Sequence, residues 1–346
     1  MSNKEIAKLL NISPTALSLI VNNKPGISET MRNRVLNQLE ELGLANIVKK
    51  RATLSVAAPN LCFVVYKRHG MILDQHPFFL LLMESIENQA RLEGFNILIT
   101  TLDNRNPITP QIDRLNRMDI QGVIVFATEM EDSDLKNLGT LQHPFIALDN
   151  EFTRLDVDTV AINNEMGTFQ SIEHLVNLGH KRIGYLQSHV RINSFMERER
   201  GYKEALQSFG MSLDPEDIFK IQYTEEGSYQ DFKKILARGA TLPTALVADV
   251  DTIAAGAMRA LHEAGFKLPQ DVSLVGFDNR PLCKISLPPL TTINVPKYSF
   301  GAEAVNALVR LIKHNEESNG NGHFGRSMKV RISTQLIIRG STCGNF

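Results

Sequence analysis

Beyond residue 60 the chain alternates between short apolar runs and longer amphipathic stretches. The runs LCFVVYK (61–67) and GVIVFA (122–127) are apolar at nearly every position. Continuous apolar strands are typical of parallel sheets that are covered on both faces. Stretches such as 78–94 and 251–265 instead repeat apolar residues at helical spacing. This alternation predicts an α/β protein with enough strand–helix units for two doubly wound, parallel-sheet lobes.

The first 43 residues have a different pattern, that of three short helices. Asn11 suits a left-handed turn after the first helix, Ser13 suits the N-cap of the second, and Pro14 suits its first turn. Ser28 is expected to cap the third helix and Gly43 to end it. A short turn between the first two helices is typical of a helix-turn-helix unit, which we expect to bind DNA. The alternative is a small three-helix interaction bundle.

Composition narrows the class of protein. A length of 346 residues suits two or three domains, and 43% hydrophobic residues is ordinary for a soluble globular chain. No apolar run approaches the roughly 20 residues of a membrane span, so we expect no membrane partner. No secretory signal is visible, and the three cysteines are odd in number and widely separated. These features predict reduced thiols and a cytoplasmic location.

Charge is distributed unevenly along the chain. Residues 1–51 contain eight lysines or arginines and four acidic residues, a net charge of +4, whereas the remainder carries −5. A basic module attached to an acidic body favours nucleic-acid binding, although chance patchiness would give the same count. The common motifs for nucleophilic hydrolysis, phosphate loops, zinc proteases and redox dithiols are absent. We therefore expect no enzyme activity, no cofactor and no metal site.

Several stretches resemble the LacI/GalR family of transcription regulators. They are EIAKLLNISPTALSLIVNN (5–23), IEHLVNLGHKRIGYL (172–186), VSLVGFDN (272–279) and PPLTTINVP (288–296). The resemblance covers nearly the whole chain in the family's order. It implies a type I periplasmic-binding-protein fold behind the head, in which the chain crosses three times between two lobes. It also implies a homodimeric repressor controlled by a small-molecule effector.

The resemblance sets the expected domain boundaries. The crossings are expected near 162–163, 290–293 and 320–325. The expected parts are a DNA-binding head at 1–46, a basic linker or hinge at 47–60, and an effector-binding and dimerisation domain at 61–346, with lobe 1 near 61–162 and 293–321 and lobe 2 near 163–290 and 325–346.

In this family the second helix of the head carries the residues that read DNA. By match, Pro14, Thr15 and Leu19 reach base edges and Ser18 reaches a phosphate. Leu19 cannot form a bidentate contact to guanine but can touch a thymine methyl, unless it belongs to the core. Backbone contacts are expected from nearby basic residues. The DNA-binding set is Pro14, Thr15, Ser18, Leu19, Lys24, Arg32 and Lys50.

The linker departs from the family pattern. Family members place a leucine that wedges into the minor groove where this chain has Ala52. Leu54 lies two residues later and is a candidate substitute, while Lys49, Lys50 and Arg51 suit phosphate contacts. The alternative is a flexible, solvated basic linker. We expect weaker DNA bending than is typical of the family.

The resemblance also implies an effector site between the lobes. Asp149 and Asp278 end apolar strands, and Arg198 lies where the family has an arginine before a Gly-aromatic pair. Carboxylates and arginine suit vicinal hydroxyls, and aromatic faces suit sugar rings. The alternatives are capping roles for the two aspartates and a core role for Phe79. The effector-binding set is Phe79, Asp149, Arg198, Tyr223 and Asp278.

Two observations bear on the effector's chemistry, which is expected to be a sugar or sugar derivative. Val250 and Val295 stand where the family often has asparagine and glutamine, so sugar-type hydrogen-bond partners are lost. The cationic loop 67–69 would suit an anionic group, or it is a solvated loop. Two other functions stay open: a solute-binding protein for transport, and a sugar-processing enzyme with this fold. The N-terminal helices argue against the first.

Overall fold

The protein is described by a computed structural model. Contacts divide it into two compact units, Met1–Ala58 and Pro59–Phe346, which are treated separately below. The predictions for Lys24, Gly43, Lys50, Ala52 and Leu54 lie outside the described residues. The structure describes residues 3–21, 26–41, 58–72, 78–317 and 327–345.

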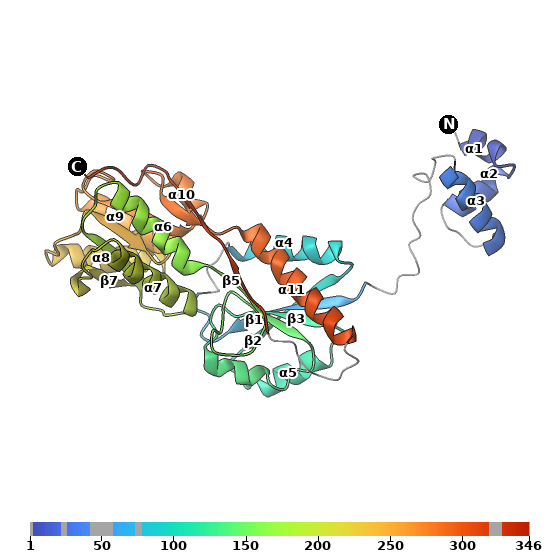
Figure 1. Cartoon of the computed structure of the whole chain (residues 1–346), viewed down its shortest axis with the longest axis horizontal. Coiled ribbons are helices and arrows are strands. Elements are labelled where there is room, and N and C mark those ends of the chain that lie inside the picture. The colour runs from blue at the N-terminus through green and yellow to red at the C-terminus, as the bar shows by residue number, and fades with distance from the viewer. Residues whose placement is uncertain (1–2, 22–25, 42–57, 73–77, 318–326, 346) are drawn as a thin grey trace. The chain divides into compact units, whose positions relative to one another are not determined.

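The first unit contains the three expected helices, α1 (Asn3–Leu9), α2 (Pro14–Val21) and α3 (Glu29–Glu41) (Figure 1). Asn11 has a φ of 53°, and the Ser13 Oγ accepts a hydrogen bond from the Ala16 N–H at 3.0 Å. These observations confirm the turn and the N-cap predicted from sequence. The buried core of the unit consists of Ile6, Ala7, Leu10, Leu17, Ile20, Val35 and Leu39.

The second unit contains two six-stranded sheets, each forming a lobe. In the first sheet every pairing is parallel and the order is β11-β5-β4-β3-β1-β2. Its elements are β1 (Asn60–Lys67), α4 (Phe78–Leu92), β2 (Asn96–Asp103), α5 (Thr109–Asn116), β3 (Gly122–Phe126), η3 (Asp132–Leu138), β4 (Phe145–Leu148), β5 (Thr159–Ile162), α11 (Lys297–Glu317) and β11 (Lys329–Ile332).

The second sheet has the order β12-β10-β9-β8-β6-β7, and only β12 is antiparallel to its neighbour. Its elements are α6 (Asn164–Asn177), β6 (Ile183–Ser188), α7 (Asn193–Ser208), η4 (Pro215–Asp217), β7 (Ile218–Ile221), α8 (Glu225–Ala237), β8 (Ala245–Ala248), α9 (Asp251–Glu263), β9 (Ser273–Asp278), α10 (Leu282–Ile285), β10 (Thr291–Asn294) and β12 (Gln335–Ile337).

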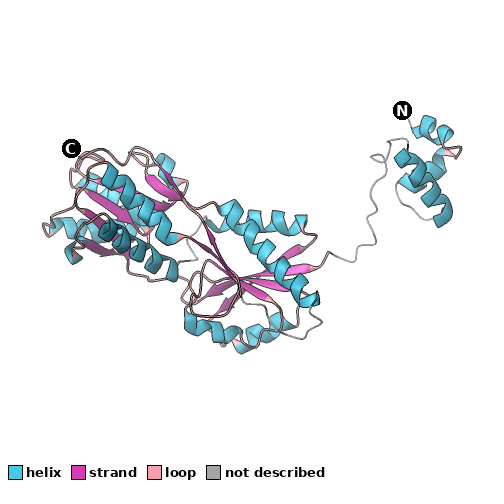
Figure 2. Ribbon diagram, in the orientation of Figure 1, coloured by secondary structure: helices cyan, strands magenta, loops and turns pink. Residues whose placement is uncertain are grey.

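Burial along β1 explains why the strand reads as a continuous apolar run. Leu61 and Phe63 pack in the cluster that contains the α4 and α11 side chains, whereas Cys62 and Val64 pack in the cluster that contains α5. Successive side chains of a strand point to opposite faces, so both faces of the sheet are covered. Figure 2 shows the same layering of strands between helices in both lobes. The α/β, two-lobed fold predicted from sequence is confirmed.

The chain passes between the lobes at three places, two of which differ from expectation. The first lies between β5 and α6, where the resemblance put it. The second follows β10, which pairs with β9 through Thr291 and Val275, so the chain leaves lobe 2 near 295–296. The third follows β11, which pairs with β5, and falls near 333–334. Residues 327–332 therefore belong to lobe 1 and residues 293–294 to lobe 2, against the expected boundaries. Within the described ranges, no helix is long and apolar enough to cross a membrane.

Candidate functional site

The head presents one face of α2 to solvent. Pro14, Thr15 and Ser18 are exposed, while Leu17 and Ile20 point into the core. Leu19 is half-buried and lies at the border between the two faces. The three exposed residues are thus accessible to DNA, and Leu19 is partly accessible.

Arg32 does not occupy the exposed position expected of a phosphate contact. It is 8% exposed, and its Nη1 lies 3.5 Å from the carbonyl oxygens of both Leu19 and Ile20. A guanidinium in this place satisfies carbonyl groups at the C-terminus of α2, where the helix dipole favours positive charge. We assign Arg32 to the support of α2 and not to the DNA surface. Arg34, two residues later, is exposed.

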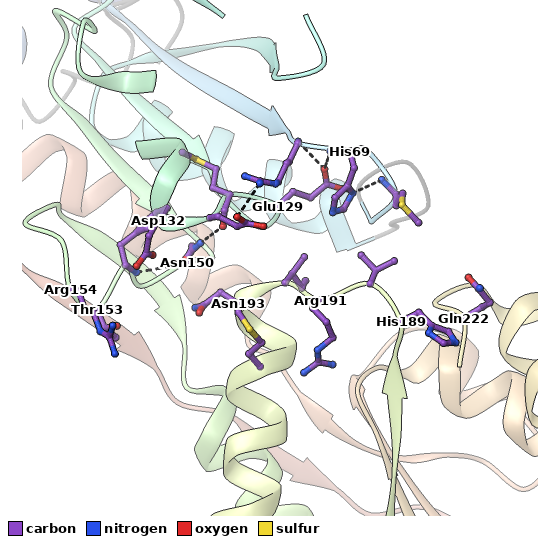
Figure 3. A pocket seen from close by; sticks show the side chains of 18 residues that line it. His69, Glu129, Asp132, Asn150, Thr153, Arg154, His189, Arg191, Asn193 and Gln222 are labelled. Atoms are coloured by element: carbon purple, nitrogen blue, oxygen red, sulfur yellow. Dashed lines mark hydrogen bonds and ion pairs between the residues drawn. The ribbon is translucent and has the colours of Figure 1, made fainter. Parts of the chain in front are cut away.

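A cavity of about 970 Å³ lies between the two lobes of the second unit. Lobe 1 contributes the loops that follow β1, β3 and β4, and lobe 2 contributes those that follow β6 and β7. In Figure 3, His69, Glu129 and Asn150 face Arg191 and Gln222 across the opening. The carboxyl ends of parallel strands are where such folds bind ligands, and the volume suits a small molecule.

The charged side chains of the cavity wall are largely paired within the protein. The Arg68 guanidinium lies 2.9 Å from Glu131 and 2.5 Å from Asp134. The Arg191 guanidinium lies 3.0 Å from Asp249 and 2.8 Å from Glu199. The cationic loop that suggested an anionic ligand is thereby balanced by carboxylates.

Asp149 follows the last residue of β4 and precedes the cavity-lining Asn150. It has a φ of 71°, and its Oδ2 accepts a hydrogen bond from the Thr128 hydroxyl at 2.6 Å. The side chain is partly accessible, yet surrounding protein atoms desolvate the carboxyl group and raise its pKa to about 7. The Thr128 bond and the positive charge of Arg198 act in the opposite direction, with smaller effects. A strained, desolvated carboxylate at a strand end is a typical feature of functional sites.

Arg198 and Asp278, two residues of the expected effector-binding set, contact one another. The Arg198 Nη2 lies 3.2 Å from the Asp278 Oδ1, and both side chains are buried. The Arg198 Nε donates to the Asn164 Oδ1 at 2.9 Å and its Nη1 donates to the Asp249 carbonyl at 2.5 Å. The guanidinium also stacks on Phe277, 3.6 Å from the ring centre. This network lies at the start of α6, directly after the chain first passes from lobe 1 to lobe 2.

Tyr223 is not presented to the cavity as a stacking surface. It is 3% exposed and packs in the lobe 2 core, with its ring centre 6.0 Å from that of Phe195. Burial raises the pKa of its hydroxyl above the ordinary value. Its neighbour Gln222 lines the cavity instead. The backbone of Phe79 lies in α4, but its side chain is outside the described residues.

Sequence reasoning missed most of the side chains that line the cavity. His189, Asn193 and Gln222 follow strands or begin helices, as do Arg154 and Asp132. The available signal was position, since each lies within a few residues of a predicted strand end. Residue type alone did not single them out, because exposed loops commonly carry such residues.

The geometry defines a class of protein: a helix-turn-helix head joined in sequence to a two-lobed domain with a ligand-sized cavity between its lobes. Residues 172–342 match the family model described as a periplasmic binding protein-like domain. The chain is 27% identical to the NTD biosynthesis operon regulator NtdR of Bacillus subtilis (strain 168), over 98% of each chain. It is 28% identical to the ribose operon repressor of Haemophilus influenzae, over 91% of this chain and 93% of that one.

Among solved structures, the lac repressor dimer bound to operator and the anti-inducer ONPF matches with a TM-score of 0.71, at 21% identity over 99% of both chains. That likeness shows the fold. These comparisons confirm the resemblance to the LacI/GalR family of transcription regulators that the sequence showed. These two relatives are named as regulators, which agrees with the transcription regulator predicted from the sequence.

Proposed function

We propose that the protein is a dimeric repressor that binds operator DNA through α2 and responds to a polar small molecule held between its lobes. The observation that carries the proposal is the cavity of about 970 Å³, whose wall is built by loops of both lobes. A ligand that contacts both lobes stabilises one lobe orientation over another by its difference in affinity for the two.

The DNA-binding part of the proposal rests on the exposed face of α2. Thr15 offers a hydroxyl to a base or a phosphate, Ser18 offers one to a phosphate, and Leu19 offers a methyl surface to thymine. The lac repressor structure to which the chain is similar contains an operator. By that likeness, each head reads one half of a two-fold symmetric site.

The effector part of the proposal rests on charge balance. Arg68 and Arg191 are already paired with carboxylates, so the wall offers hydrogen-bonding groups without a large net charge. We infer a neutral, hydroxyl-rich ligand such as a sugar or sugar derivative, in place of an anionic one. Asp149 is its proposed acceptor of hydroxyl hydrogen bonds, and Arg198 and Asp278 are the buried network behind it.

The dimer part of the proposal rests on exposed apolar side chains in both lobes. On lobe 1, Leu81 of α4 is 49% exposed and Ile99 of the edge strand β2 is 57% exposed. On lobe 2, Ile285 at the end of α10 is 81% exposed and Leu287, two residues later, is 79% exposed. Apolar side chains gathered on an edge strand and a neighbouring helix mark interaction surfaces. We assign both patches to contact between two copies of the chain.

Two measurements test the proposed function. Selection from randomised duplexes should enrich a two-fold symmetric site. A thermal-shift screen of sugars, sugar phosphates and nucleosides should find a neutral polyol that raises the melting temperature, since a bound ligand stabilises by mass action. His189→Ala or Gln222→Ala should reduce that shift, whereas Gln230→Ala on the exposed face of α8 should not. A protein that binds the ligand and enriches no duplex would favour the solute-binding alternative.

A further inference from the structure

Glu129 is a buried carboxylate that binds the backbone of a loop in the same lobe. It follows β3 and is 2% exposed. Its Oε2 accepts the N–H groups of Arg68, His69 and Gly70 at 3.0, 3.1 and 2.7 Å, and its Oε1 accepts that of Ile72 at 2.9 Å. Four main-chain donors thus converge on a single carboxylate.

The conformation of the loop is what brings these donors together. Gly70 has a φ of 76°, a left-handed conformation that glycine adopts without strain. Successive N–H groups around such a residue form a concave anion-binding nest. Here the anion is part of the protein. The His69 Nδ1 also lies 3.3 Å from the Glu129 Oε1. Because the nest is filled, the loop 68–72 is fixed to the loop after β3.

The far end of this loop crosses the cleft. Ile72 belongs to lobe 1 by sequence, yet its side chain is 2% exposed and packs in the apolar cluster of lobe 2. That cluster contains Ile192, Phe195 and Tyr223. Two other residues of the loop, His69 and Met71, line the cavity between the lobes. The loop therefore touches the cavity and both lobes at once.

We propose that Glu129 and Ile72 form a latch that closes one side of the cleft. Glu129 is the positioning residue: it holds the loop in the shape that carries Ile72 into lobe 2. The buried isoleucine then holds the lobes together, because separating them would expose its apolar surface to water. The latch stands on contacts alone, whereas its regulatory meaning rests on the proposed function.

A pair of Glu→Gln variants distinguishes loss of the hydrogen bonds that hold the loop from a general loss of negative charge. Glu129→Gln keeps the shape of the side chain but puts an NH₂ donor where an oxygen accepted N–H groups. The control is Glu131→Gln, which removes an acid from the same cavity wall and from Arg68 but leaves the nest intact. Ile72→Ala removes the apolar plug and leaves Glu129 in place.

The experiment measures loop protection and lobe separation in the full-length protein, without DNA or effector. Hydrogen exchange followed by mass spectrometry reports on residues 68–72. Spin labels on cysteines introduced at the exposed Lys136 of lobe 1 and Gln230 of lobe 2, in a Cys343→Ser background, report the distance between lobes. Circular dichroism verifies that each variant is folded.

We expect Glu129→Gln to accelerate exchange in the loop at least tenfold and to add a longer interlobe distance. Ile72→Ala should add the longer distance while the Glu129-bound amides stay protected, and Glu131→Gln should do neither. If Glu129→Gln and Ile72→Ala are folded and keep the wild-type distance distribution, the latch is overturned. A lower melting temperature with an unchanged distance would show a purely structural role for Glu129. Neither reading depends on whether the protein binds an operator.

Discussion

At the scale of single residues, Arg32 and Arg34 show how two similar side chains acquire different tasks. Arg32 is buried against the last carbonyls of α2, whereas Arg34 is exposed on α3. Arg32→Ala should lower the stability of the head by roughly 1–3 kcal/mol, because carbonyl groups lose a charged donor. Arg34→Ala should leave stability unchanged. Thermal unfolding of the two variants measures the loss of stability in each. Equal losses of stability would refute the assignment of Arg32 to the support of α2.

Asp149 should make stability depend on pH. Its pKa is about 7 in the folded protein, against an ordinary value of 3.8, so the folded state binds more protons between these values. The contribution of Asp149 to the free energy of unfolding therefore falls as pH rises from about 4 to 7, by at most about 1.4 kcal/mol per pH unit. Above about pH 7 this contribution is constant. The free energy of unfolding of Asp149→Asn should therefore increase relative to that of the wild type as pH rises through this range.

The measurement is chemical unfolding of both proteins at several pH values between about 5 and 8. Asp103→Asn is the control, since hydrogen bonds from Arg105 lower the pKa of Asp103 to about 2 and its titration lies outside the window. The stability difference for the control should stay constant with pH. A constant difference for Asp149→Asn as well would contradict the raised pKa.

Residue positions were easier to predict from the sequence than residue contacts. The strand ends at Asp149 and Asp278 were correctly located, because apolar runs end there. That Arg198 and Asp278 pair with each other was not predictable, since 80 residues separate them and only the folded sheet brings them together. The same holds for Arg32, whose charge suggested DNA and whose burial depends on how α3 packs against α2.

At the scale of elements, α2 carries a prediction about sequence reading. Thr15→Ala should weaken binding to the selected operator, at a cost of about 1–3 kcal/mol, and leave binding to random duplex nearly unchanged. Ser18→Ala, on the same exposed face, should weaken both to a similar extent, because a phosphate contact carries no sequence information. Fluorescence anisotropy with both duplexes measures the effect. Equal losses on both for Thr15→Ala would remove it from the base-reading set.

Long elements were easier to predict than the short strands at the crossings between the lobes. The eight-residue β1 and the fifteen-residue α4 have patterns long enough to show their period. Strands β5, β11 and β12 have four, four and three residues, too few for a period to appear. Their pairing is decided by the sheets they join, and that is why two of the crossings between lobes were misplaced.

At the scale of the whole molecule, the exposed apolar patches predict an assembly. The double variant Ile99→Lys and Ile285→Lys should be monomeric and folded, because each copy would bring buried charge into the interface. Operator affinity should fall at least tenfold, since two linked heads bind more tightly than one. Leu213→Lys is the control, an apolar residue 44% exposed outside both patches. Sedimentation velocity measures the oligomeric state of each variant. A double variant that stays dimeric would place the interface elsewhere.

The interleaved path of the chain through both lobes has a consequence for how the protein is made. Among the described elements, lobe 1 receives α11 and β11 only after β1 to β10 have been synthesised, and β12, which follows them, completes the sheet of lobe 2. Ser341 then joins β9 through two hydrogen bonds with the main chain of Leu274, at 2.7 and 2.6 Å. The core of the head lies within the first 39 residues, so the head can fold before the lobes have been synthesised. On the ribosome a complete head therefore precedes two incomplete lobes, whose exposed apolar faces make the nascent chain prone to aggregation until both lobes are finished.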